Sequence, residues 1–183
     1  MPIALTGWAR MRAADPGYYG PWRRAYIELA SRIVSGLGLR EGPQVLEVGP
    51  HVCPLVMHCH TLDIREQLRP TYLHDARTAP WPMPNGAYEL AIALQVWEHL
   101  AGRQQPAFRE LRRVSRRALL SYPYRWPPTT ETGWRADHAG LDERHYRRWT
   151  APYRPARHWV VGEVGAQRKL ELFDWTQEAA AGE

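Results

Sequence analysis

The sequence predicts an α/β protein with an open, seven-stranded and mostly parallel β-sheet that ends in an antiparallel hairpin. Short apolar runs bounded by glycine or proline, as at residues 45–48 and 88–94, are typical of strands buried on both faces. Most runs alternate with segments of helical spacing, which predicts parallel strand pairs with helices on the sheet faces. The last two runs, residues 158–164 and 168–175, are separated by Gly165-Ala166-Gln167, a hairpin signal that predicts an antiparallel end to the sheet.

The length and composition indicate one globular domain, residues 1–183. A chain of 183 residues with 44% hydrophobic residues can bury a full core. No apolar run reaches membrane-spanning length, and residues 1–14 lack an apolar core followed by a cleavage site, so we expect no membrane partner. The two cysteines, Cys53 and Cys59, suit a reducing compartment, and we expect a cytoplasmic protein.

The net charge of +5 is carried almost entirely by arginine, because Lys169 is the only lysine. Basic proteins gain affinity for nucleic acids by releasing counterions from phosphates, so an RNA partner is an alternative. The arginines are spread along the chain instead of forming one block. This composition does not require a nucleic-acid surface, and we do not expect a nucleic-acid partner.

The first 38 residues are expected to contain turns followed by one helix. Residues 1–20 hold the turn sequence Asp15-Pro16-Gly17, and Pro21 is well placed as the first residue of a helix. Helical spacing continues to residue 35, after which glycines end the helix. The aromatic residues of this segment are expected to pack in the core, with closure over a ligand as the alternative. They are Tyr18, Tyr19 and Trp22.

A short loop and an acidic residue are predicted to meet at one edge of the sheet. The first strand, residues 45–48, stops at Gly49, and the next strand, residues 60–64, carries Asp63 near its C-terminal end. Because parallel strands place their C-terminal ends at the same edge, the Gly49 loop and the Asp63 carboxylate are expected to lie together. This arrangement is typical of a nucleoside site, with the carboxylate on the ribose hydroxyls.

The middle of the chain is expected to form two further strands. A third strand at residues 71–74 ends at Asp75, and a proline-rich loop follows at residues 79–86. The central strand, residues 88–94, has Gln95 at its C-terminal tip. Both strand ends therefore contribute polar side chains to the edge where Gly49 and Asp63 lie.

The second half of the chain is expected to continue the alternation. A helix starts at residues 96–100 and continues through the amphipathic segment 106–114, and a fifth strand spans residues 118–122. Residues 123–140 are expected to be irregular, and long irregular segments in compact domains are usually functional or disordered. Asp142 is expected to cap a helix that runs to Trp149, and residues 177–183 are expected to be frayed.

Five motifs in this order resemble those of class I S-adenosylmethionine (SAM)-dependent methyltransferases of the type 11-like group. They are QVLEVGPHVCPLVMHCHTLDIR at residues 44–65, His74-Asp75-Ala76, Trp81-Pro82, Ala87-Tyr88-Glu89-Leu90 and Val96-Trp97-Glu98-His99-Leu100. The resemblance covers residues 39–126. It implies a Rossmann-like sandwich with strand order 3-2-1-4-5-7-6, with SAM as the cofactor and S-adenosylhomocysteine as its product.

The resemblance also implies which residues bind the cofactor. The candidates at the corresponding positions of the motifs are Glu47, Gly49, Pro50, His51, Asp63, Ile64, Asp75, Ala76 and Gln95. Asp75 is expected to meet the adenine amine, with a turn aspartate as the alternative. The chain departs from the family at His51 and Cys53, which stand where the family has its second and third glycines, and the interval from Gly49 to Asp63 is too short for the usual helix.

Methyl transfer from a sulfonium needs alignment of the acceptor and uptake of a proton, so catalytic candidates should follow the strands at the binding edge. They are Glu98, His99, Tyr124 and His138. The Glu98-His99 pair resembles one in ubiquinone-type O-methyltransferases, where such residues can help hold a divalent cation. The pair is also common in methyltransferases without a metal, so a capping carboxylate and a packed histidine are the structural alternative.

A second set of possible metal ligands lies in the first motif: His51, Cys53, His58, Cys59 and His60. A structural zinc site needs four converging ligands, and the familiar Cys-x-x-Cys spacing is absent from this set. On a strand, His58 and His60 would share one face while Cys59 points to the other. We therefore predict no metal site.

The predicted division of the chain follows from the resemblance. Residues 1–38 form an N-terminal helical cover, 39–126 the cofactor-binding core, 127–156 a substrate loop with a short helix, and 157–176 the C-terminal hairpin. The function expected is that of a bacterial SAM-dependent methyltransferase, monomeric or homodimeric, acting on a small-molecule or saccharide acceptor. The alternatives are a catalytically silent binding or partner protein with the same fold, and an RNA methyltransferase.

Overall fold

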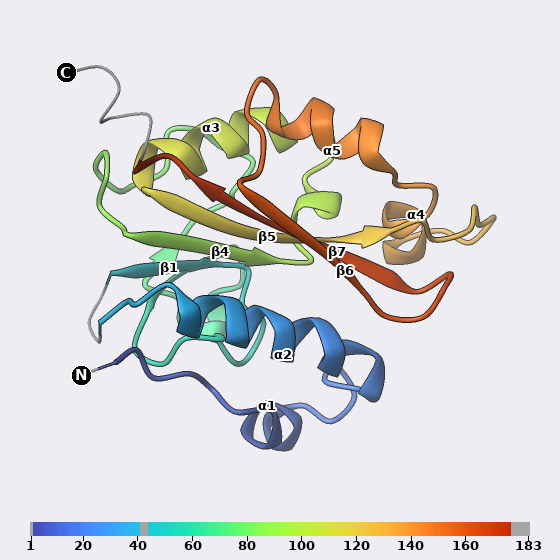
Figure 1. Ribbon diagram of the computed structural model, residues 1–183, viewed down its shortest axis with the longest axis horizontal. Helices are drawn as coiled ribbons and strands as arrows, with labels where there is room; N and C mark the ends of the chain where they lie inside the picture. Colours follow the sequence, from blue (N-terminus) through green and yellow to red (C-terminus); the bar gives the residue numbers. More distant parts are fainter. Residues whose placement is uncertain (1, 41–43, 177–183) are drawn as a thin grey trace.

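The computed structural model describes residues 2–40 and 44–176, so the predicted fraying of residues 177–183 lies outside the described residues. These residues form one sheet of seven strands in the order β3-β2-β1-β4-β5-β7-β6, which confirms the predicted order (Figure 1). The strands are β1 (Val45–Val48), β2 (His60–Asp63), β3 (Tyr72–Leu73), β4 (Leu90–Leu94), β5 (Arg117–Tyr124), β6 (Arg157–Val161) and β7 (Gln167–Asp174).

Strands β1 to β5 pair in parallel, whereas β7 pairs antiparallel with both β5 and β6. The hairpin turn occupies residues 162–166 and holds Gly162 and Gly165 at positive φ. Strands β1 and β4 are buried along almost their whole length, as expected for strands covered on both faces. Their carboxyl ends lie at the same edge as that of β2.

Helices cover both faces of the sheet (Figure 1). They are α1 (Trp8–Ala14), α2 (Pro21–Gly36), α3 (Gln104–Val114), α4 (Trp134–His138) and α5 (Glu143–Thr150), with short 3-10 turns η1 (Glu66–Leu68) and η2 (Trp97–His99). On one face, α1 and α2 pack against Val45, Ile92 and Leu119. On the other, α3 and α5 pack against a cluster that includes Ala118 and Leu120, as the alternation of side chains along β5 requires.

Three elements differ from the sequence-based expectations. Helix α1 lies in a segment expected to contain only turns, and it is held by tertiary packing because Met11 is buried against the sheet. The helix expected from residue 96 is a 3-10 turn, since Ala101 and Gly102 both adopt positive φ and separate it from α3. Residues 123–140, expected to be irregular, contain α4 and the end of β5.

The connection between β1 and β2 contains no helix, as the short interval predicts, and the N-terminal segment packs beside it. The amide of Thr6 donates to the carbonyl of Leu55 at 2.8 Å, and the amide of Met57 donates to Ala4 at 2.9 Å. Tyr19 donates from its hydroxyl to the carbonyl of Cys53 at 3.1 Å. Residues 2–19 therefore cover the stretch that a crossover helix covers in other α/β sheets.

Helix α5 begins as predicted. The Asp142 carboxylate accepts from the amides of Arg144 and His145, and the His145 side chain completes a capping box. This fixes the start of the helix that follows the long segment after β5.

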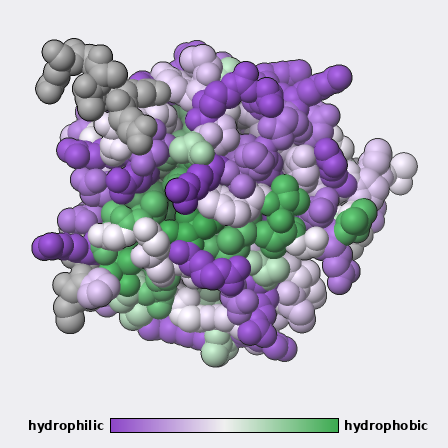
Figure 2. Space-filling view, in the orientation of Figure 1, coloured by the Kyte–Doolittle hydropathy of each residue, from purple (hydrophilic) through white to green (hydrophobic). Residues whose placement is uncertain are grey.

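The outer surface carries a hydrophobic band between α2 and the β6–β7 hairpin (Figure 2). Partly buried hydrophobic side chains also pack against the core cluster that α1 and α2 cover, among them Leu29, Ile33, Trp159 and Val161. Within the described residues, no helix is long and apolar enough to cross a bilayer.

Candidate functional site

A pocket of about 330 Å³ lies at the carboxyl ends of β1, β2 and β4. Open α/β sheets place their ligands at this edge. Seven of the predicted site residues line the pocket: Gly49, His51, Asp63, Ile64, Asp75, Ala76 and Gln95, and the catalytic candidate His99 joins them. The structure therefore gathers most of the predicted cofactor residues around one cavity.

Gly49 allows the loop after β1 to pass close to the end of β4. Its φ is 62°, and a Cβ atom at this position would lie 2.8 Å from a methyl group of Val96. A side chain would both strain the backbone and collide with Val96. The glycine of the first motif is thus required by local geometry, independently of any ligand.

Two acidic residues of the pocket are each paired with an arginine two positions later. The Asp63 carboxylate accepts from Nε and Nη2 of Arg65 at 2.9 and 2.8 Å, and also from the Arg65 amide. Burial acts to raise the pKa of Asp63, but the bonds from Arg65 outweigh it and the net shift is downward. Asp75 is paired with Arg77 in the same way, at 2.8–3.0 Å, and its pKa is lowered by that bond.

His51 links the N-terminal segment to the Asp63–Arg65 ion pair. Its φ is 58°, so it adopts the left-handed conformation that a glycine would take here. Nε2 lies 2.9 Å from a carboxylate oxygen of Asp15, Nδ1 lies 3.1 Å from Nη1 of Arg65, and the ring stacks on Tyr18 at 3.7 Å. Because Tyr18 also lines the pocket, His51 holds part of the pocket wall in place.

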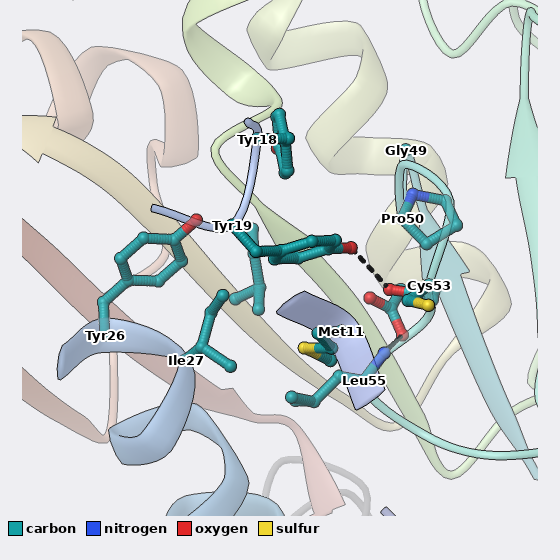
Figure 3. A pocket seen from close by; sticks show the side chains of 11 residues that line it. Met11, Tyr18, Tyr19, Tyr26, Ile27, Gly49, Pro50, Cys53 and Leu55 are labelled. Atoms are coloured by element: carbon teal, nitrogen blue, oxygen red, sulfur yellow. Dashed lines mark hydrogen bonds between the residues drawn. The ribbon is translucent and has the colours of Figure 1, made fainter. Parts of the chain in front are cut away.

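Glu47 and Pro50 line a separate cavity of about 20 Å³ on the other side of Gly49 (Figure 3). The Glu47 carboxylate is buried and accepts from the Leu55 amide at 2.7 Å. Burial raises the pKa of Glu47 to about 8. Figure 3 shows Tyr19 lying across this space with its hydroxyl on the Cys53 carbonyl. In this arrangement Glu47 holds the loop after β1 and does not reach the larger pocket.

Gln95 closes the pocket at the tip of β4. Its φ is 59°, its amide donates to Ser121, and its side-chain nitrogen donates to the Ser121 hydroxyl at 3.0 Å. The side-chain oxygen is buried and has no hydrogen-bond partner among the described residues. A buried acceptor without a partner costs free energy, so this oxygen is available to a donor on a ligand.

Three of the four catalytic candidates come together at one side of the pocket. Nε2 of His138, from α4, lies 3.4 Å from Oε1 of Glu98 and 3.5 Å from Nε2 of His99. Tyr124 is not part of this group and does not line the pocket. Its ring lies 6.1 Å from that of Tyr146.

The three side chains have unequal environments. The Glu98 side chain is fully buried, and burial raises its pKa to about 8. Burial, with the charges of His99, Arg168 and Arg23, lowers the pKa of His138 to about 3, which keeps this imidazole neutral. His99 is 40% exposed and its Nδ1 lies 2.9 Å from a carboxylate oxygen of Asp137.

Possible metal ligands converge at this cluster in the described part of the chain. The ligand atoms of Glu98, His99 and His138 all lie within 4.8 Å of one another. The histidines and cysteines of the first motif, all of them described, form no such group. His51 is bonded to Asp15, and Cys53 and Cys59 are free thiols whose pKa values are raised by burial.

Sequence reasoning missed three charged residues of the site: Arg65, Arg77 and Asp137. The two arginines share one signal, since each follows by two positions an aspartate that lies at the end of a strand or shortly after it. Asp137 carries no such signal, because its contact with His99 depends on how α4 packs against η2. Tyr18 was expected to pack in the core, with ligand closure as the alternative, and it lines the pocket.

No protein-family model matches this sequence, and no curated protein matches it either. Solved structures do. A SAM-dependent methyltransferase from Aquifex aeolicus is 16% identical with a TM-score of 0.56, and the match covers 91% of this chain and 97% of that one. Magnesium protoporphyrin IX methyltransferase from Synechocystis PCC 6803, with bound SAM, is 15% identical with a TM-score of 0.55. That match covers 92% of this chain and 97% of the Synechocystis chain.

The [4+2]-cyclase SpnF is also similar, at 15% identity and a TM-score of 0.58 over 78% of this chain and 62% of that one. Since one fold hosts both methyltransferases and a cyclase, the likeness identifies the architecture and not the reaction. The strand order and the antiparallel terminal hairpin agree with this fold. The chain has the fold of the class I SAM-dependent methyltransferases.

Proposed function

We propose that this protein is a SAM-dependent methyltransferase that acts on a small-molecule or saccharide acceptor. The observation that carries the proposal is the 330 Å³ pocket at the carboxyl ends of β1, β2 and β4, with Gly49, Asp63 and Asp75 in its wall. The similar Synechocystis enzyme with bound SAM supports the same cofactor. SAM would supply a methyl group already activated by its sulfonium.

Each pocket residue has a defined task in this proposal. Asp63 accepts hydrogen bonds from the ribose hydroxyls, and Asp75 accepts from the adenine amine. The turn at Gly49 lets the loop backbone approach the ligand, and the unsatisfied oxygen of Gln95 accepts from a donor on it. Residues 1–38 serve as the cover, since Tyr18 forms part of the wall.

The acceptor would enter from the side formed by residues 127–156. This segment carries His138 next to Glu98 and His99, and His99 reaches the pocket. Excluding water and orienting the acceptor are the main requirements of a methyl displacement.

Isothermal titration calorimetry with SAM and S-adenosylhomocysteine tests the proposal directly. We expect saturable binding of both ligands to the folded chain, at one site each. Absence of binding at millimolar ligand, to protein with an intact melting transition, would remove the enzyme assignment.

A catalytically silent binding protein is the second candidate, because both oxygens of Asp63 already accept from Arg65 and His51 occupies a glycine position. Replacing His51 with glycine separates the two. Glycine relieves the left-handed backbone but releases Tyr18 and Arg65 from their contacts. If His51 is part of a working site, we expect His51→Gly to weaken SAM binding about tenfold, or ~1.4 kcal/mol.

The matched control is Asp15→Asn, which weakens the contact between Asp15 and His51 without altering the loop after β1. We expect it to weaken SAM binding in the same direction but by less. A marked gain in affinity for His51→Gly would indicate that the native loop obstructs the cofactor, and would favour the silent binding protein.

The structure gives little support to the third candidate, an RNA methyltransferase. Arginines at the end of α3 and the start of β5 contact groups of the protein itself: Arg113 pairs with Glu110, Arg116 with Glu89, and Arg117 with Asp174. Their charge is therefore largely balanced within the fold. Steep salt dependence of tRNA binding would revive this candidate.

A further inference from the structure

The side chains of Glu98, His99 and His138 face one another, and their ligand atoms all lie within 4.8 Å of one another. The separations of His138 Nε2 from Glu98 Oε1 and from His99 Nε2 are 3.4 and 3.5 Å, longer than charge-assisted hydrogen bonds of this kind. Neither oxygen of Glu98 has a hydrogen-bond partner among the described residues. Three ligand groups, two of them on residues at most 5% exposed, thus lie within 4.8 Å of one another, and the Glu98 oxygens among them accept from no donor in the described part of the chain.

The spacing fits an ion at that centre. Ligand atoms around a tetrahedral ion with bonds of about 2.1 Å lie about 3.4 Å from each other. Two of the three separations match this edge length, and the third is within 4.8 Å, so only a small side-chain shift is needed.

A partner outside the cluster orients the exposed histidine. Nδ1 of His99 faces the Asp137 carboxylate at 2.9 Å, which leaves Nε2 as the atom directed at Glu98 and His138. Metal-binding histidines commonly use a carboxylate in this way to fix the ring and its tautomer. Asp137 and His138 are neighbours on α4, so one short helix supplies both a ligand and this orienting carboxylate.

We propose that Glu98, His99 and His138 form a site for one divalent transition-metal ion, with Zn²⁺ as the best match to two imidazoles and a carboxylate. Three protein ligands leave at least one coordination position open. The charges of Arg168 and Arg23 also act on Glu98, and they oppose a cation here. We therefore expect affinity in the micromolar range, roughly 1–100 μM, below that of closed structural sites.

The use of this site rests on the proposed function. His99 reaches the pocket, so the open position is at its acceptor side. An acceptor hydroxyl bound there would lose its proton to water more easily. Its oxygen would then form a bond to the methyl carbon as the carbon–sulfur bond breaks and leaves its electron pair on sulfur. The products are a methyl ether, S-adenosylhomocysteine and the released proton, which favours an alcohol or phenol as the acceptor.

The test is metal binding by the chelator-treated full chain, without SAM. Calorimetry with Zn²⁺ and absorption spectra with Co²⁺ should show one ion per chain, without thiolate charge-transfer absorption. His138→Ala should weaken binding at least 100-fold. Asp137→Ala, an exposed change, should weaken it about tenfold. His158→Ala removes an exposed histidine of the hairpin and should leave binding unchanged.

Absence of one-site binding of either ion at millimolar concentration would overturn the proposal. So would wild-type affinity in both His138→Ala and Asp137→Ala when their melting temperatures are unchanged. These metal titrations contain no SAM, so they test the ion site separately from the methyltransferase proposal. A protein that binds the metal ion but not SAM would support the ion site and remove the methyltransferase assignment.

Discussion

Replacing Asp63 with alanine is expected to weaken SAM binding by about thirty-fold to several hundred-fold, or ~2–4 kcal/mol. The Asp63 residue is only 6% exposed, and its carboxylate lies in the pocket wall. Its two oxygens accept three bonds from Arg65, two on Oδ1 and one on Oδ2, which leaves one lone pair on Oδ2 for a ribose hydroxyl. The loss should appear in calorimetric titrations at a temperature where the variant is folded.

The cost to folding should be smaller. Losing the bond from the Arg65 amide is expected to lower the free energy of unfolding by about 1 kcal/mol, as for other lost caps. Asp174→Ala is the matched control, because it removes an aspartate paired with Arg117 far from the pocket. A variant that melts much earlier yet binds SAM as the wild type does would contradict the assignment of Asp63.

Replacing Lys169 with methionine is expected to lower the free energy of unfolding by about 3–5 kcal/mol at pH 8. Lys169 lies on β7 with its Nζ 2.6 Å from carboxylate oxygens of both Glu143 and Glu171. Burial acts to lower the pKa of Lys169, but these two bonds raise it, so the amine stays charged. Methionine would leave Glu171, whose side chain is 3% exposed, as a buried charge without its cation.

The size of this effect should depend on pH. Burial raises the pKa of Glu171 above its value in the unfolded chain, and removing Lys169 raises it further. A carboxyl of this kind loses stability as pH rises through its folded pKa, so the penalty at pH 8 should exceed that at pH 5. Urea unfolding of wild type and variant at both pH values measures the difference.

Two further variants complete this test. Lys169→Met combined with Glu171→Leu removes both buried charges and should recover most of the lost stability. Arg24→Met breaks an ion pair whose side chains are 60% and 40% exposed, and should cost at most about 1 kcal/mol. Equal losses for Lys169→Met at pH 5 and pH 8 would show that lost packing, and not the unpaired carboxylate, causes the effect.

The sheet could be predicted from the sequence because its strands have local signals. The run at residues 45–48 ends at Gly49, and the hairpin strands flank a glycine-containing turn. These signals do not depend on the rest of the fold. Helix α1 could not be predicted, because only contact with the sheet makes the burial of Met11 favourable.

The candidate site divides in the same way. Gly49, Asp63, Asp75 and Gln95 lie at the ends of strands or shortly after them, so topology alone brings them to one edge. His138 was predicted as a candidate, but its position against Glu98 and His99 depends on α4, which has no clear signal in the sequence. Pairings set by side-chain packing over forty residues of chain are not visible in local patterns.

The N-terminal segment has a consequence for how this protein can diversify. Residues 2–19 fill the place of a crossover helix, and Tyr18 of the same segment stacks on His51 in the pocket wall. A change there that alters the pocket also disturbs the core, so selection on stability constrains it. Residues 127–133 are exposed, so a change there does not disturb the core in the same way. Among relatives with different acceptors, we expect variation to concentrate in that stretch while the N-terminal segment changes slowly.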